Sequence, residues 1–125
     1  MHVRIASGKG ISKEEQEQRY AEKAALIARF NQDKQALGVD GLIYPTVACI
    51  PPAVASTQDA DKIGGINMHC LRNTSTVNYF DGCGISLPCH QDGEAPVGLM
   101  LGSQHGDDDR LLQMAAALEG VMVID

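Results

Sequence analysis

Apolar positions in the first third of the chain recur at helical spacing. Segment 13–37 contains neither glycine nor proline and is rich in Ala, Glu, Gln and Lys, which favour helices. Ser12 and Glu15 have the spacing of a capping box, and Gly38 follows where a left-handed C-terminal cap is common. We therefore expect one long amphipathic helix. Its apolar stripe comprises Tyr20, Ala24, Ile27, Ala28 and Phe30.

Shorter apolar runs further along the chain have the pattern of strands. Residues 41–44 form one such run, which Pro45 ends, and we expect a buried strand there. Residues 85–87 and 97–101 form two more, and the longer loop between them contains Gly93, so this region predicts a β-hairpin.

The segments between these runs are less regular. Gly64 and Gly65 lie in segment 51–66, which is rich in Pro, Ala, Ser and Asp, and this glycine pair predicts a turn. Residues 73–80 suit a short helix or a turn, and residues 121–124 are apolar enough for a last strand.

A second helix is predicted near the C-terminus. Residues 107–109 are three aspartates, which can supply an N-cap and favourable negative charge at a helix N-terminus, and Gly120 ends the helix. The expected buried face comprises Leu111, Leu112, Met114, Ala115 and Leu118.

Together these elements predict an α/β fold with a small mixed sheet, a long N-terminal amphipathic helix and a C-terminal helix. The length of 125 residues suits a single domain spanning 1–125. Hydrophobic residues make up 44% of the chain and charged residues 21%, which is ordinary for a globular protein and argues against disorder.

Charge excludes some partners. The chain has 10 Lys and Arg against 16 Asp and Glu, a net charge of -6, and no segment concentrates positive charge. Non-specific nucleic-acid binding needs such a basic footprint, so we expect no nucleic-acid partner. The apolar stretches are short and broken by prolines, so we expect no membrane span. Four cysteines without a signal peptide indicate free thiols and a cytoplasmic protein.

The common catalytic and metal-binding motifs do not match. Gly8-Lys9-Gly10 lacks the spacing of a phosphate-binding loop, and Ser86 is not followed by the glycine of a nucleophile elbow. The cysteine spacings fit no zinc motif, so we expect neither a metal nor a cofactor. Two alternatives stay open: a metal site built from separate segments, and a thiol nucleophile at Cys83 or Cys89 with a histidine as base.

Several segments carry a more specific pattern in a fixed order. In the second half they are residues 73–78, 84–89, 95–102 and 109–119. They resemble the C-terminal part of the amidase signature family, which typically has an Asn before a turn, an S-x-P strand, a P-x-G strand and a D-x-x-L-L helix. The first half is similar to the same family at residues 3–8, in the long helix, and at Asp40 with residues 42–46.

The resemblance implies amide chemistry but not the machinery for it. Family members, which include glutamyl-tRNA amidotransferase A subunits, hydrolyse or transfer amides with a Ser–cis-Ser–Lys triad in a Gly/Ser-rich segment. That segment lies upstream of the matched part, and this chain has no Gly-Ser-Ser-Gly run. The match therefore covers the scaffold and one wall of the substrate pocket, and we assign no catalytic residue.

The resemblance also implies four substrate-binding positions. Arg4 matches an arginine that grips the substrate carboxylate in glutamine-using members. Asn78, Asp81 and Cys83 lie in a turn that matches the pocket-lining loop. Asp81 and Cys83 replace the family's usual Gly and Pro, and Arg72 stands where glutamine-using members have an acid, which argues against glutamine recognition. Arg4 as a surface cation and Asn78 as a residue that bonds its own turn remain alternatives.

Our leading hypothesis is a stand-alone or truncated C-terminal module of an amidase-signature protein, catalytically inert alone. The alternatives are an amide hydrolase whose triad comes from a partner chain, and a small-molecule or protein binding module. An isolated module of this kind would expose sheet edges and an apolar helix face. We therefore expect a two-fold homodimer, or association with the missing N-terminal part of an amidase.

Overall fold

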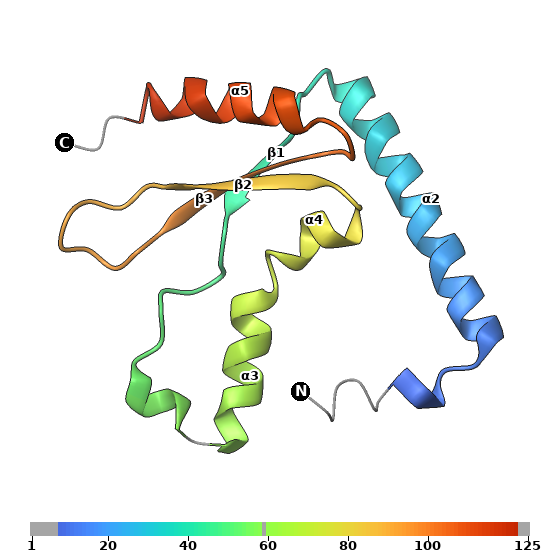
Figure 1. The fold of residues 1–125 in the computed structure, drawn as a ribbon, viewed down its shortest axis with the longest axis horizontal. Helices are drawn as coiled ribbons and strands as arrows, with labels where there is room; N and C mark the ends of the chain where they lie inside the picture. The colour runs from blue at the N-terminus through green and yellow to red at the C-terminus, as the bar shows by residue number, and fades with distance from the viewer. Residues whose placement is uncertain (1–7, 59, 123–125) are drawn as a thin grey trace.

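The computed structural model describes residues 8–58 and 60–122. Helices surround a small sheet, as the sequence predicts, with a long N-terminal helix and a C-terminal helix (Figure 1). The elements in chain order are η1 (Gly8–Gly10), α2 (Lys13–Leu37), β1 (Leu42–Pro45), η2 (Val54–Thr57), α3 (Ala60–Leu71), α4 (Ser75–Tyr79), β2 (Cys83–Pro88), β3 (Gly98–Ser103) and α5 (Asp108–Glu119).

The sheet has three strands in the order β1-β3-β2, and both strand pairs are antiparallel. The hairpin of β2 and β3 confirms the sequence prediction. A mixed sheet would also contain a parallel pair, and none occurs among the strands of the described ranges. The register places Tyr44 opposite Met100 and Met100 opposite Ser86, so these three residues share one face of the sheet.

Helix α5 covers the other face of the sheet and forms the core with it. The buried cluster comprises Leu87, Leu101, Leu111 and Ala115. Leu112 was predicted to join this face, but its side chain is 56% exposed. Leu112 directly follows Leu111, and neighbouring helix positions point about 100° apart, so burying Leu111 turns Leu112 outward.

Helix α4 lies on the face opposite α5. The side chain of Val77 covers Gly84 and Gly102, so closely that a Cβ built at Gly102 would meet Val77 Cγ1 at 2.8 Å. The two glycines therefore let α4 approach the sheet, and the short helix expected within 73–80 is confirmed.

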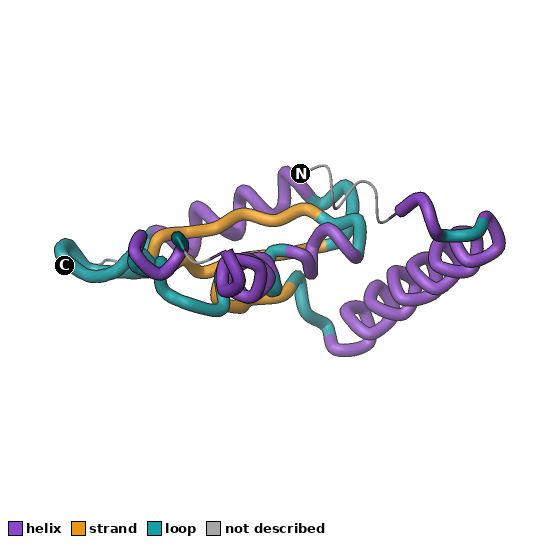
Figure 2. The backbone as a smooth tube through the Cα atoms, turned by 90° about the horizontal axis from the view of Figure 1, so that it is seen from below, coloured by secondary structure: helices purple, strands orange, loops and turns teal. Residues whose placement is uncertain are grey.

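Helix α2 has the predicted ends but few contacts. The Ser12 hydroxyl accepts from the backbone N–H of Glu15, and Gly38 adopts a left-handed conformation. No residue of the helix is buried, and Tyr20 of the expected apolar stripe is 65% exposed. Figures 1 and 2 show α2 at one end of the molecule, where Phe30 stacks on Phe80 with ring centroids 4.7 Å apart.

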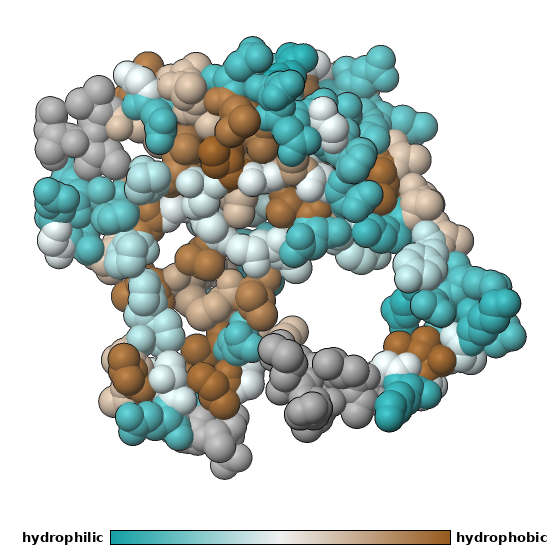
Figure 3. All heavy atoms as spheres, viewed as in Figure 1, coloured by the Kyte–Doolittle hydropathy of each residue, from teal (hydrophilic) through white to brown (hydrophobic). Residues whose placement is uncertain are grey.

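Helices η2 and α3 contact each other and form a lobe to one side of the sheet (Figure 1). The turn expected at Gly64 and Gly65 is wrong, because both glycines lie inside α3. Neither has a neighbouring atom within 4 Å of an added Cβ, so nothing in the tertiary structure requires a glycine there. Figure 3 shows apolar side chains at the surface of this lobe.

Two strand predictions also need correction. β1 is an edge strand rather than a buried one, because it pairs only with β3 and leaves Ile43 59% exposed. The last strand expected at 121–124 is not formed at Val121 and Met122, and the rest of it lies outside the described residues. These two residues follow α5 directly and bond back to Leu118.

The chain exposes much surface for its mass. Its accessible surface is 9232 Å², whereas a compact monomer of 13.3 kDa is expected to expose about 6,500 Å². Within the described ranges, no helix has the length and apolar character needed to span a membrane.

Candidate functional site

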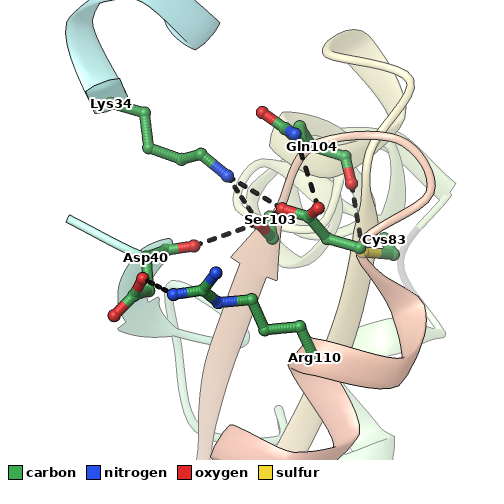
Figure 4. A network of polar contacts seen from close by, with 7 residues as sticks. Lys34, Asp40, Cys83, Ser103, Gln104 and Arg110 are labelled. Carbon is green, nitrogen blue, oxygen red and sulfur yellow. Dashed lines mark hydrogen bonds and ion pairs between the residues drawn. The ribbon is translucent and has the colours of Figure 1, made fainter. Parts of the chain in front are cut away.

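A network of polar side chains joins the end of α2 to the start of α5 (Figure 4). Lys34 Nζ donates to Asp107 Oδ2 at 2.8 Å and to Ser103 Oγ at 3.2 Å. The Ser103 hydroxyl donates to the same Asp107 oxygen at 2.6 Å, and its residue is only 4% exposed. The network therefore connects three elements through one carboxylate.

Further contacts extend this network on both sides. The side-chain amide nitrogen of Gln104 lies 3.4 Å from Asp107 Oδ1, and the Gln104 backbone carbonyl accepts from Cys83 Sγ at 3.3 Å. Arg110 forms an ion pair with Asp40, whose backbone carbonyl lies 3.1 Å from Ser103 Oγ. Figure 4 shows these side chains converging on the end of β3.

The protonation state of Asp107 follows from its hydrogen bonds. The hydrogen bond from Lys34, reinforced by that from Ser103, lowers the pKa of Asp107 from its ordinary value of 3.8. Asp107 is therefore an anion at neutral pH. Lys34 Nζ lies within hydrogen-bond distance of both this anion and the Ser103 hydroxyl, so one set of hydrogen bonds holds the three side chains together. We call these three side chains, Lys34, Ser103 and Asp107, the clamp, because their hydrogen bonds hold the end of α2 against the end of β3 and the start of α5.

The sequence predicted a different role for Asp107. It occupies the N-cap position of α5, but its side chain makes no capping hydrogen bond. Its Oδ2 accepts from Lys34 and from the Ser103 hydroxyl instead. A hydrogen bond between charged groups, such as the one from Lys34, is stronger than a bond to a neutral backbone N–H. Asp108 and Asp109 lie in the first turn of the helix, where negative charge is favourable.

Three of the four predicted substrate-binding residues, Asn78, Asp81 and Cys83, lie in the described part of the structure. Asn78 lies near the end of α4 and Asp81 in the turn that follows. The Asp81 N–H donates to the Asn78 carbonyl at 3.3 Å, and both side chains are exposed. Asp81 has a positive φ of 55° and lies 4.0 Å from His105. Cys83 packs against the core below α5. Arg4 lies outside the described residues.

The two thiols considered as nucleophiles differ in environment. Burial, and then the negative charge of Asp108, raise the pKa of Cys83, so its thiol stays protonated at neutral pH and is a poor nucleophile. Cys89 is exposed, and its sulfur lies 3.6 Å from the Val97 carbonyl. No group of three or more His, Cys, Asp or Glu within the described ranges could hold a metal ion.

A pair of hydroxyls lies on the α4 side of the sheet. Thr46 Oγ1 and Ser86 Oγ are 2.5 Å apart, and both lie over Gly98, where an added Cβ would come within 2.8 Å of each oxygen. The neighbouring Asn73 amide donates to the Pro45 carbonyl at 2.8 Å. The Ser86 hydroxyl therefore forms a hydrogen bond with the Thr46 hydroxyl.

The sequence did not indicate the clamp. Lys34 lies 73 positions from Asp107, and neither residue belongs to a motif that marks the contact. Only the spacing of four between Ser103 and Asp107, at the end of a strand and the start of a helix, is a local signal.

An apolar groove borders the clamp on the edge of the sheet. It has a volume of about 420 Å³ and lies between β1 and α5. Its apolar lining includes Leu42, Ile43, Leu101, Met114, Leu118 and Val121.

Comparisons with known proteins relate most of the chain to one family. The family model described as amidase matches residues 1–112. The chain is 30% identical over 106 residues to 2-amino-5-chloromuconic acid deaminase of Comamonas testosteroni, covering 82% of this chain and 23% of that protein. It is 35% identical over 85 residues to the A subunit of glutamyl-tRNA(Gln) amidotransferase from Salinispora tropica, covering 67% of this chain and 16% of that protein.

A second amidotransferase A subunit is similar to the chain to nearly the same extent. The corresponding amidotransferase chain of Salinispora arenicola is 33% identical over 85 residues, with the same two shares. The chain thus spans less than a quarter of the length of these curated relatives. No solved structure matches it.

Proposed function

The chain belongs to the amidase family, and from this premise we propose that it is a stand-alone or truncated C-terminal module that does not hydrolyse amides by itself. Its share of the relatives' length, 16–23%, supports a module rather than a whole enzyme. The observation that carries the proposal is the position of Lys34, whose Nζ is engaged by Asp107 and by the buried Ser103.

A Ser–Ser–Lys relay needs a lysine that can accept a proton from a serine. Here Lys34 Nζ is engaged by the Asp107 carboxylate at 2.8 Å. Ser103 is also 4% exposed and donates its own proton toward the same carboxylate. A carbonyl substrate could not reach that oxygen without opening the clamp. The contact between Lys34 and Ser103 therefore supports a role in stability rather than in catalysis.

A panel of simple amides tests this proposal. The purified 125-residue chain is incubated with each amide, and ammonia release is measured against buffer. We expect no turnover above buffer for the native chain or for Ser103→Ala. Turnover by the native chain that a serine-directed reagent abolishes would overturn the proposal.

The relatives suggest a second arm for the same assay. Two of them are named as the A subunit of an amidotransferase, so they are components of larger assemblies. The chain is therefore also assayed with a separately produced amidase N-terminal part that carries the triad. Turnover by the mixture, but by neither part assayed separately, would favour the alternative in which a partner chain completes an amide hydrolase.

We also propose that a second copy or an amidase N-terminal part covers the exposed apolar surface. The chain exposes 9232 Å², against about 6,500 Å² for a compact monomer of its mass. Large apolar side chains that are exposed include Ile43 on β1, Tyr20 on α2 and Val54 in η2. Light scattering is expected to give twice the chain mass for a two-fold homodimer, and a clean monomer at high concentration would contradict the dimer. A cytoplasmic location remains part of this proposal, since all four thiols are free.

A further inference from the structure

Two cysteines meet at the base of the lobe formed by η2 and α3. Cys49 follows β1 by four residues, and Cys70 lies in the last turn of α3. Their sulfurs are 3.4 Å apart, although the residues are 21 positions apart in sequence. Cys49 lies between β1 and η2, and Cys70 lies one residue before α3 ends, so the two flank the segment that forms the lobe. The two thiols therefore lie across its neck.

The pair is within reach of small reagents. Cys49 lines an open pocket of about 380 Å³, together with Ile50, Pro52, Gly65, Ile66 and His69. Both cysteines are half-buried rather than enclosed. A disulfide has an S–S bond of about 2.0 Å, so the sulfurs need to approach by about 1.4 Å. Side-chain rotation can supply a movement of this size.

We propose that Cys49 and Cys70 form a reversible dithiol–disulfide site that closes the neck of the lobe when the protein meets a low-molecular-weight disulfide. Cys49 Sγ, on the open pocket, attacks one sulfur of the reagent and displaces a thiol. Cys70 Sγ then attacks Cys49 Sγ, which forms the intramolecular bond and releases the second thiol. The protein loses two electrons and two protons, and the reagent gains both.

The consequence is a change in local order. The new bond closes a loop of residues 49–70, which contains η2 and all of α3 except its last residue, and these two elements contact each other. A cross-link of this kind stabilises chiefly by restricting the unfolded chain. The oxidised protein should therefore melt at a higher temperature than the reduced one. In a reducing compartment the pair returns to two thiols.

Peptide mapping tests the inference directly. The hydrogen bond to Cys70, and then burial, raise the pKa of Cys49, so the chain is incubated with excess oxidised glutathione at about pH 9, above the ordinary thiol value. Free thiols are then alkylated, and the protein is digested with trypsin. Cleavage after Lys34, Lys62 and Arg72 places Cys49 in residues 35–62 and Cys70 in residues 63–72. We expect these two peptides joined by a disulfide, and a raised melting temperature.

The other two cysteines provide the control. Cys83 and Cys89 share the tryptic peptide 73–110, and the exposed Cys89 sulfur contacts a backbone carbonyl rather than a thiol. Cys89→Ser should keep the cross-link, and Cys70→Ser should lose both the cross-link and the melting shift. Separate glutathione adducts on Cys49 and Cys70 in the native chain, or a bond from either to peptide 73–110, would overturn the inference. The native-chain map decides even if a variant does not fold.

Discussion

At the scale of single residues, the Asp107 carboxylate joins three side chains, those of Lys34, Ser103 and Gln104. One of its oxygens accepts from both Lys34 and Ser103, and the other lies near the Gln104 amide. The side chains of Lys34 and Asp107 are 14% and 20% exposed, so water screens their ion pair less than a surface pair. This one carboxylate holds the end of α2 against the start of α5.

Replacing Asp107 tests that role. Asp107→Asn removes the charge that Lys34 binds, and we expect the free energy of unfolding to fall by about 1–3 kcal/mol. Urea denaturation measures the change. Asp33→Asn is a matched control, because Asp33 forms an exposed pair with Arg29 at 3.5 Å. It should change stability by less than about 0.5 kcal/mol. Equal effects of the two variants would contradict the clamp.

The lowered pKa of Asp107 also makes a prediction about pH. The folded protein holds the carboxylate ionised below its ordinary value of 3.8, so this contribution to stability is fully present above that value. It is lost as the pH falls through 3.8 and the lower folded value. The stability difference between the native chain and Asp107→Asn should therefore shrink in acid. A difference that stays constant from about pH 7 to about pH 3 would show that the charge plays no part.

Residue-level features were predictable where the contact is local. Ser12 caps α2 three residues ahead of its donor, and Gly38 closes the helix through bonds to the preceding turn, so both could be read from spacing. The clamp could not be read from the sequence, because Lys34 and Asp107 lie 73 positions apart and meet only in the folded chain. The pairing of Cys49 with Cys70 was hidden for the same reason.

At the scale of elements, glycines set how closely the segments approach one another. A Cβ at Gly82 would lie 2.2 Å from the Ser103 carbonyl oxygen, where β2 begins beside the end of β3. At Gly65, inside α3, an added Cβ meets nothing within 4 Å. The same substitution at these two positions should therefore have opposite effects.

Alanine at both sites provides a paired test. Gly82→Ala forces the start of the hairpin apart, and we expect a loss of about 1–3 kcal/mol in the free energy of unfolding. Gly65→Ala removes backbone freedom from the unfolded chain and should add about 0.5–1 kcal/mol. Urea denaturation of both variants measures the two changes. A destabilising Gly65→Ala would show that the position has a contact the structure lacks.

Prediction of the elements succeeded where the pattern was strong. The uninterrupted helix-forming run gives α2, and two apolar runs around a loop give the hairpin of β2 and β3. Helix α3 was missed because Gly64 and Gly65 favour a turn locally, while the residues around them continue the helix. β1 was expected to be buried, because its apolar residues do not reveal that it lies at the edge of the sheet.

At the scale of the whole molecule, the fold is a scaffold with a small core. Among the residues that the structure describes, the buried apolar side chains lie at the contact of α5 with the sheet, with Met100 on the other face. The family match covers residues 1–112, and the relatives are four or more times as long as the matched part. The resemblance to amidases could be read from the sequence, because it rests on short motifs in a fixed order. Several of these motifs lie on β2, β3 and α5, which pack against one another in the structure.

The central claim is that this amidase-family chain carries no activated serine. Labelling with a serine-directed fluorophosphonate tests it most directly, because the reagent needs an activated nucleophile but no particular substrate. Intact-mass spectrometry of the 125-residue chain is predicted to show no adduct under conditions that fully label a complete amidase. A stoichiometric adduct, mapped to Ser103 or to Ser86, would contradict the account.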